Sequence, residues 1–137
     1  MSPTAARVAR TDAGLASVLR VSVMRLRRRL VGERDPHNDL GIGQMAVLGA
    51  LFRHGESSVG ALADYEKVKP PSMTRTVTCL EEAGHVRRRV SEEDKRLVLV
   101  ELTEQGRTVL EADRRKRDAW LAQRLAELSR EEREVLR

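Results

Sequence analysis

A pair of adjacent prolines, Pro70 and Pro71, stands in front of a stretch of helical character that ends at Gly84. Proline lacks a backbone N–H and its ring clashes with the preceding turn, so a helix accommodates it only in the first turn, where N–H groups have no partner within the helix. The prolines therefore place a helix start at residue 70, with Lys69 in the cap position. The side of this helix that should face the core is formed by Met73, Val77 and Leu80.

The segments that precede this helix also have helical patterns. Residues 13–31 repeat apolar side chains at helical spacing between many arginines, which predicts a long amphipathic first helix. Residues 42–54 are apolar nearly all round, so we expect a buried second helix that ends before a glycine. A short helix over residues 59–65 follows, and Ser57 or Ser58 can cap its start.

The segments after Gly84 predict a basic hairpin and two further helices. Residues 86–102 alternate valines and arginines and then become rich in aliphatic residues, which indicates two strands joined by a polar tip at residues 91–95. Thr103 is a plausible N-cap for a long helix, and Ser129 with Glu132 forms a capping box for a last one. We therefore predict a mainly α protein with a small β-hairpin.

The order of these elements is that of a winged helix-turn-helix, in which the second helix of the pair enters the major groove of DNA and the hairpin reaches over the backbone. A helix end that approaches base edges needs small or hydrogen-bonding side chains and one long donor. The predicted helix carries such residues in its first turns: Ser72, Thr74, Arg75 and Thr76. Lys69, in the cap position, is expected to add a phosphate contact.

Composition agrees with a nucleic-acid partner and argues against several other classes. The 137 residues suit a single domain, and their formal charge of +5 and pI near 10.1 favour an anionic partner. The charge is uneven, at +6 over residues 1–34, −4 over residues 35–66 and +3 over residues 67–96. No spacing of nucleophile and base, phosphate loop or metal ligands indicates an enzyme or a cofactor. The absence of a signal peptide or apolar span predicts a cytoplasmic protein without a membrane partner.

The segment SSVGALADYEKVKPPSMTRTVTCLEEAGHVRRRVSEEDKRLVLVELTEQG resembles the MarR-type winged-helix transcriptional regulators. The strongest matches are Ser72, Thr74-Arg75, Leu80-Glu81 and Gly84, the wing sequence Asp94-Lys95-Arg96, and then Leu102-Thr103 and Gly106. The resemblance implies one domain over residues 1–137, with dimerisation helices at 1–34 and 104–137 and a DNA-binding part at 41–103. It further implies a homodimer, usually a repressor, on a near-palindromic operator of double-stranded DNA, which a small phenolic or lipophilic effector can release.

The resemblance also assigns residues. Arg96 would enter the minor groove, with Asp94 aiming it and Lys95 beside it, while Arg75 and Ser72 would belong to the major-groove helix. Two departures stand out, since the family often has a hydroxyl where this chain has Lys69 and a proline where it has Glu92.

Alternatives remain for several of these features. The arginines at 87–89 could be a solvated strand face, or they could contact the DNA backbone, chiefly through Arg87 and Arg89. Asp94 and Arg96 could form a simple surface ion pair. Cys79 could sense redox state, although the chain holds no second cysteine. As alternatives to regulation, the chain could be a winged-helix module for protein interaction or a basic protein that coats nucleic acid without sequence preference.

Overall fold

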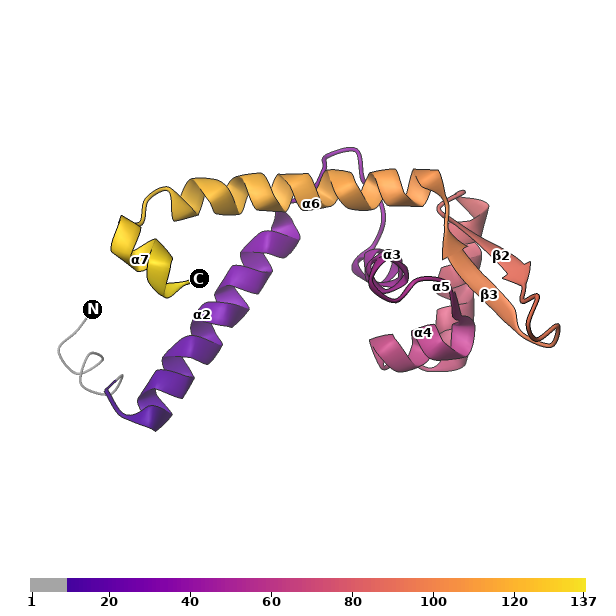
Figure 1. The fold of residues 1–137 in the computed structure, drawn as a ribbon, viewed down its shortest axis with the longest axis horizontal. Helices are drawn as coiled ribbons and strands as arrows, with labels where there is room; N and C mark the ends of the chain where they lie inside the picture. Colours follow the sequence, from indigo (N-terminus) through magenta and orange to yellow (C-terminus); the bar gives the residue numbers. More distant parts are fainter. Residues whose placement is uncertain (1–9) are drawn as a thin grey trace. The chain divides into compact units, whose positions relative to one another are not determined.

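The computed structural model describes residues 10–137, which form helices and one small antiparallel sheet (Figure 1). The chain divides into two compact units. Of the described residues, 10–34 and 116–137 form one unit, and 35–115 form the other. Of the predicted dimerisation segment at 1–34, residues 1–9 lie outside the described residues.

The helices of the second unit start where the sequence predicted. Helix α3 spans Ile42–His54, α4 spans Val59–Glu66 and α5 spans Pro70–Glu82. Ser58 caps α4, because its side chain accepts a hydrogen bond from the N–H of Ala61 at 3.1 Å. Buried aliphatic side chains from all three helices meet in one core, and their largest fully buried members are Leu48, Val47, Leu62, Val77 and Leu80.

The sheet of this unit has three strands in the order β1-β3-β2, all antiparallel. Strands β2 (Val86–Val90) and β3 (Val98–Leu102) form the predicted hairpin, which Figure 1 shows beside α5. The prediction of a two-stranded sheet was incomplete. Strand β1 (Ser57–Ser58) pairs with β3, and its two residues are too few to give a sequence signal.

The expectation that residues 42–54 are buried nearly all round was wrong at the edges of α3. Its middle is inaccessible, with Leu48 at 0% exposure, whereas Ile42 is 65% exposed and Phe52 is 40% exposed. Phe52 lies at the surface under two arginines of α6, and the guanidinium of Arg114 stands 3.9 Å from the centre of its ring. Cation–π contact explains how a large aromatic side chain is retained there.

The first unit contains α2 (Asp12–Gly32), the C-terminal half of α6 (Glu104–Leu125) and α7 (Arg130–Val135). The predicted capping box is confirmed, since Ser129 and Glu132 exchange both hydrogen bonds. The predicted apolar stripe of α2 is not covered in the single chain. Its exposed members are Leu15, Val18, Leu19 and Leu26, and the neighbouring Val23 and Met24, which were not part of the predicted stripe, are exposed as well.

Within residues 10–137, no helix combines the length and the apolar character that crossing a bilayer requires.

Candidate nucleic-acid interface

Helix α5 begins as the prolines require. Lys69 occupies the N-cap position in an extended conformation and its side chain caps nothing, while its carbonyl accepts the first helical bond from the N–H of Met73 at 3.1 Å. Pro70 and Pro71 fill the first two helical positions. Lys69 and both prolines are exposed, so the leading end of the helix is open to a partner.

Hydroxyl groups on the first turns of α5 donate to carbonyls of their own helix. Thr74 Oγ1 donates to the carbonyl of Pro70 at 3.0 Å, and Thr76 Oγ1 donates to that of Ser72 at 3.1 Å. A hydroxyl whose proton is used in this way can still accept. Thr74 and Thr76 are therefore suited to accept hydrogen bonds from amino groups, which cytosine and adenine present in the major groove.

Arg75 is the long donor among these residues. It is exposed, and its Nη2 lies 3.3 Å from Ser72 Oγ one turn earlier. The structure thus brings all the predicted residues of the helix onto one end: Lys69, Ser72, Thr74, Arg75 and Thr76. The other side of α5 carries the buried Met73, Val77 and Leu80, as predicted.

The wing is the loop of residues 91–97 between β2 and β3. Asp94 organises it, because its Oδ1 accepts from the backbone N–H of Arg96 at 3.0 Å and from the guanidinium Nε of Arg96 at 3.3 Å. Ser91 is buried and supports the turn by accepting from the N–H of Asp94. The Arg96 side chain is 93% exposed, and Lys95 beside it is exposed as well. At the wing tip, Asp94 thus binds an arginine whose side chain is open to solvent.

The three arginines of β2 all pair with carboxylates that sequence reasoning did not identify. Arg87 Nε donates to Glu101 at 2.5 Å, and Arg89 binds both carboxylate oxygens of Glu56. Arg88 points the other way, toward α5, where its Nη1 is 2.6 Å from Glu81 Oε1 and its Nη2 is 3.2 Å from Thr78 Oγ1. Cross-strand register could have indicated the first pair, since Arg87 and Glu101 stand opposite each other.

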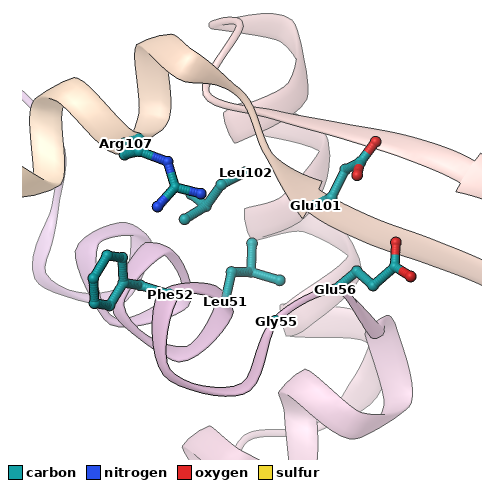
Figure 2. A pocket seen from close by; sticks show the side chains of 7 residues that line it. All are labelled: Leu51, Phe52, Gly55, Glu56, Glu101, Leu102 and Arg107. Carbon is teal, nitrogen blue, oxygen red and sulfur yellow. The ribbon is translucent and has the colours of Figure 1, made fainter.

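A cavity of about 270 Å³ adjoins the acidic partners of these arginines (Figure 2). Apolar side chains from α3 and β3 form part of its wall, and Arg107 enters from α6. Its lining residues are Leu51, Phe52, Gly55, Glu56, Glu101, Leu102 and Arg107. No sequence motif marked this cavity.

Two further candidate residues, Cys79 and His85, are not among the predicted DNA contacts. Cys79 is exposed on α5 as a free thiol. His85 is buried with its Nδ1 unpartnered, and burial lowers the pKa of its imidazole. Among the described residues, no three histidine, cysteine or acidic side chains are grouped to hold a metal ion.

Comparison with known proteins gives consistent matches. The MarR family model matches residues 40–98. An HTH-type transcriptional regulator of Mycobacterium tuberculosis is 45% identical over 127 residues, which cover 93% of this chain and 88% of the relative. A MarR family protein from Bacillus stearothermophilus has a similar structure, with a TM-score of 0.81, 28% identity, and coverage of 93% of this chain and 88% of that one. Streptococcus pneumoniae FabT, solved in complex with DNA, shares the fold at a TM-score of 0.71 and 21% identity, with 89% of each chain covered.

Proposed function

Because this chain belongs to the MarR family of transcriptional regulators, which are DNA-binding proteins and not enzymes, we propose that it recognises a specific sequence of double-stranded DNA and represses transcription there. The observation that carries the proposal is that the second unit exposes hydrogen-bond donors at two places. It holds two exposed groups of donors, the leading end of α5 with Arg75 and the wing tip with Arg96. The first suits base edges in the major groove and the second suits the neighbouring minor groove.

The contacts between α5 and the hairpin support these two roles, of α5 in the major groove and of the wing in the minor groove. Arg88 joins β2 to α5 through Glu81 and Thr78, and its backbone N–H also donates to Glu81 at 3.1 Å. Because these contacts hold α5 and the hairpin in a fixed arrangement, the two proposed DNA contacts can bind a duplex together. In this proposal Lys69, Arg87, Arg89 and Lys95 contact phosphates, which position the protein but carry no sequence information.

The proposal includes a homodimer on a near-palindromic operator. The apolar side of α2 is exposed in the single chain, and exposed Leu15 and Leu19 belong to a stripe long enough to pack against a second helix. A two-fold dimer would place two α5 helices on half-sites about one turn of DNA apart, roughly 34–36 Å.

A small phenolic or lipophilic effector, if it releases the operator, is linked to DNA thermodynamically. An effector that lowers the affinity for DNA by some factor must bind the DNA complex more weakly by the same factor. Measuring the effector's affinity with and without operator therefore checks any candidate compound.

The test is fluorescence anisotropy with DNA from immediately upstream of the protein's own coding sequence, at near-physiological salt. Excess unrelated duplex is added as competitor. We expect tight binding that survives the competitor. Binding that any duplex erases equally would instead favour a basic protein that coats nucleic acid, because such binding depends mainly on counterion release. No binding to any duplex would favour the protein-interaction module.

A further inference from the structure

One face of the sheet carries two arginines and two glutamates. Arg87 and Arg89 lie two residues apart on β2, so their side chains leave the same face. Glu101 is the cross-strand neighbour of Arg87 on β3, and Glu56 stands immediately before β1, the strand on the other side of β3. We call these four residues the wing charge patch. Its formal charge is zero, and Arg87, Arg89 and Glu101 among its members lie on the hairpin that carries the wing.

Each arginine of the wing charge patch is held by one glutamate. Arg87 Nε donates to Glu101 Oε1 at 2.5 Å, and Arg89 Nε donates to Glu56 Oε2 at 2.8 Å while its Nη2 binds the same carboxylate. The hydrogen bond to Glu56 raises the pKa of Arg89, and the charges of Glu56, Glu101 and Glu92 raise it further. The positive ends of both arginines thus have carboxylate partners before any DNA arrives.

These pairs are accessible enough to be exchanged. The side chain of Arg87 is 70% exposed, and those of Arg89 and Glu56 are 36% and 40% exposed. Ion pairs in such surroundings are weak, because water competes for both partners. A DNA phosphate offers guanidinium groups the same bidentate oxygen geometry as a carboxylate. Glu56 and Glu101 line the same cavity, as Figure 2 shows. Their carboxylates hold the guanidinium donors that a phosphate would need.

We propose that Glu56 and Glu101 compete with DNA phosphates for Arg87 and Arg89, and thereby set how tightly the wing holds any duplex. The inference rests on the proposed function and adds a determinant of affinity to it. Because phosphates carry no sequence information, the competition weakens binding to operator and to unrelated DNA by the same factor. The ratio between the two affinities, which is the specificity, is left unchanged.

The experiment replaces each glutamate by its uncharged isostere. Glu101→Gln and Glu56→Gln should each tighten binding to operator and to unrelated duplex by roughly two- to fivefold, the range expected for an exposed ion pair. Binding should also become more sensitive to salt, with the slope of log K against log salt steeper by up to about 0.9 for each arginine released. Unchanged affinity would overturn the proposal, as would weaker binding, which would mean that the glutamates orient the arginines.

A double-mutant cycle separates the pairing from a general effect of negative charge. Arg87 is exposed, so Arg87→Ala should fold normally, and in that background Glu101→Gln should no longer tighten binding. Glu93→Gln removes the same charge at the exposed wing tip and is the matched control, with a smaller expected effect. An equal gain from Glu101→Gln with and without Arg87 would overturn the proposal. Wild-type protein that binds no duplex would overturn the proposed function as well, whereas sequence-specific binding untouched by these substitutions would overturn the competition alone.

Discussion

Gly106 at the start of α6 lies so close to His85 that a Cβ on this glycine would stand 2.1 Å from the His85 carbonyl oxygen. The obstacle is backbone, so a change of rotamer cannot relieve it. Both residues belong to the second unit, and Thr103 reinforces the contact by donating from its N–H to the same carbonyl at 3.2 Å. His85 lies in the turn between α5 and β2, so this close approach packs the first turn of α6 against the turn that follows α5.

Gly106→Ala should therefore destabilise the protein, by about 1–3 kcal/mol or more, because backbone must shift to admit one methyl group. Urea denaturation followed by circular dichroism measures the effect. Gly43→Ala is the matched control, since a Cβ there meets nothing within 4 Å and the position is inside α3. The free energy of unfolding of this control should increase by about 0.5–1 kcal/mol. Equal stability of the two variants would contradict the close approach.

The burial of His85 predicts a pH dependence of stability. The folded-state pKa of its imidazole is lowered by desolvation, whereas the histidine of the unfolded chain has the ordinary pKa of about 6.5. As the pH falls below that value, the unfolded state takes up a proton that the folded state resists, so the free energy of unfolding decreases. Above about pH 7.5 both states are neutral and the effect vanishes.

Urea denaturation at pH 7.5 and 5.5 checks this sign. Wild type should lose stability on acidification, by up to about 1.4 kcal/mol per pH unit, and His85→Gln should remove that part of the loss. His37→Gln is the control, because it makes the same replacement at an exposed histidine. A loss that persists in His85→Gln would assign the dependence to other groups.

Arg96→Ala should weaken operator binding by about 1.5–3 kcal/mol, the usual value of hydrogen bonds to a charged group. Stability should change by no more than about 0.5 kcal/mol, since the side chain is 93% exposed. Asp94→Asn should weaken binding less, because it weakens the contact that orients Arg96 but leaves the positive charge of Arg96 in place. Arg53→Ala, which removes the same charge from the same unit, is the control. Anisotropy titrations that show equal affinity for Arg96→Ala and wild type would remove the wing tip from the interface.

Arg75→Ala should cost on the order of 1–3 kcal/mol on the operator if the arginine reads a base. Its effect on an unrelated duplex should be much smaller, so the specificity ratio falls. Competition titrations with both duplexes measure this ratio. A uniform loss on all sequences, together with a shallower salt dependence, would make Arg75 a phosphate contact instead.

Local signals predicted much of the fold. Two prolines marked the start of α5, Gly84 takes a positive φ of 84° where the helix was expected to end, and Thr103 accepts from the N–H of Gly106 as a cap should. Each of these signals depends only on the backbone conformation and hydrogen bonding of a few neighbouring residues, so it can be recognised without knowledge of the rest of the fold. The leading residues of α5 and the Asp94–Arg96 pair followed from such local order together with the family resemblance.

Features that depend on distant partners were not predictable in this way. Asp113 stands beside a run of basic residues and no local pattern distinguishes it. In the structure it is fully buried and accepts from the N–H of Asp35 at 3.0 Å and from Asn38 Nδ2 at 2.9 Å. Strand β1 exists because β3 offers it an edge. The carboxylate partners Glu56 and Glu101 are likewise set by the register of the sheet, which no single segment specifies.

The two prolines that start α5 also limit what its backbone can offer a ligand. An ordinary helix start presents the N–H groups of its first three residues, but here only Ser72 among the first three positions has one. A phosphate approaching along the helix axis would therefore find a single main-chain donor in place of the usual cradle. DNA contacts at this end of α5 must therefore be made mainly by side chains, and single substitutions can change these one at a time. A change of DNA target in a relative of this protein needs no rebuilding of the turn before α5.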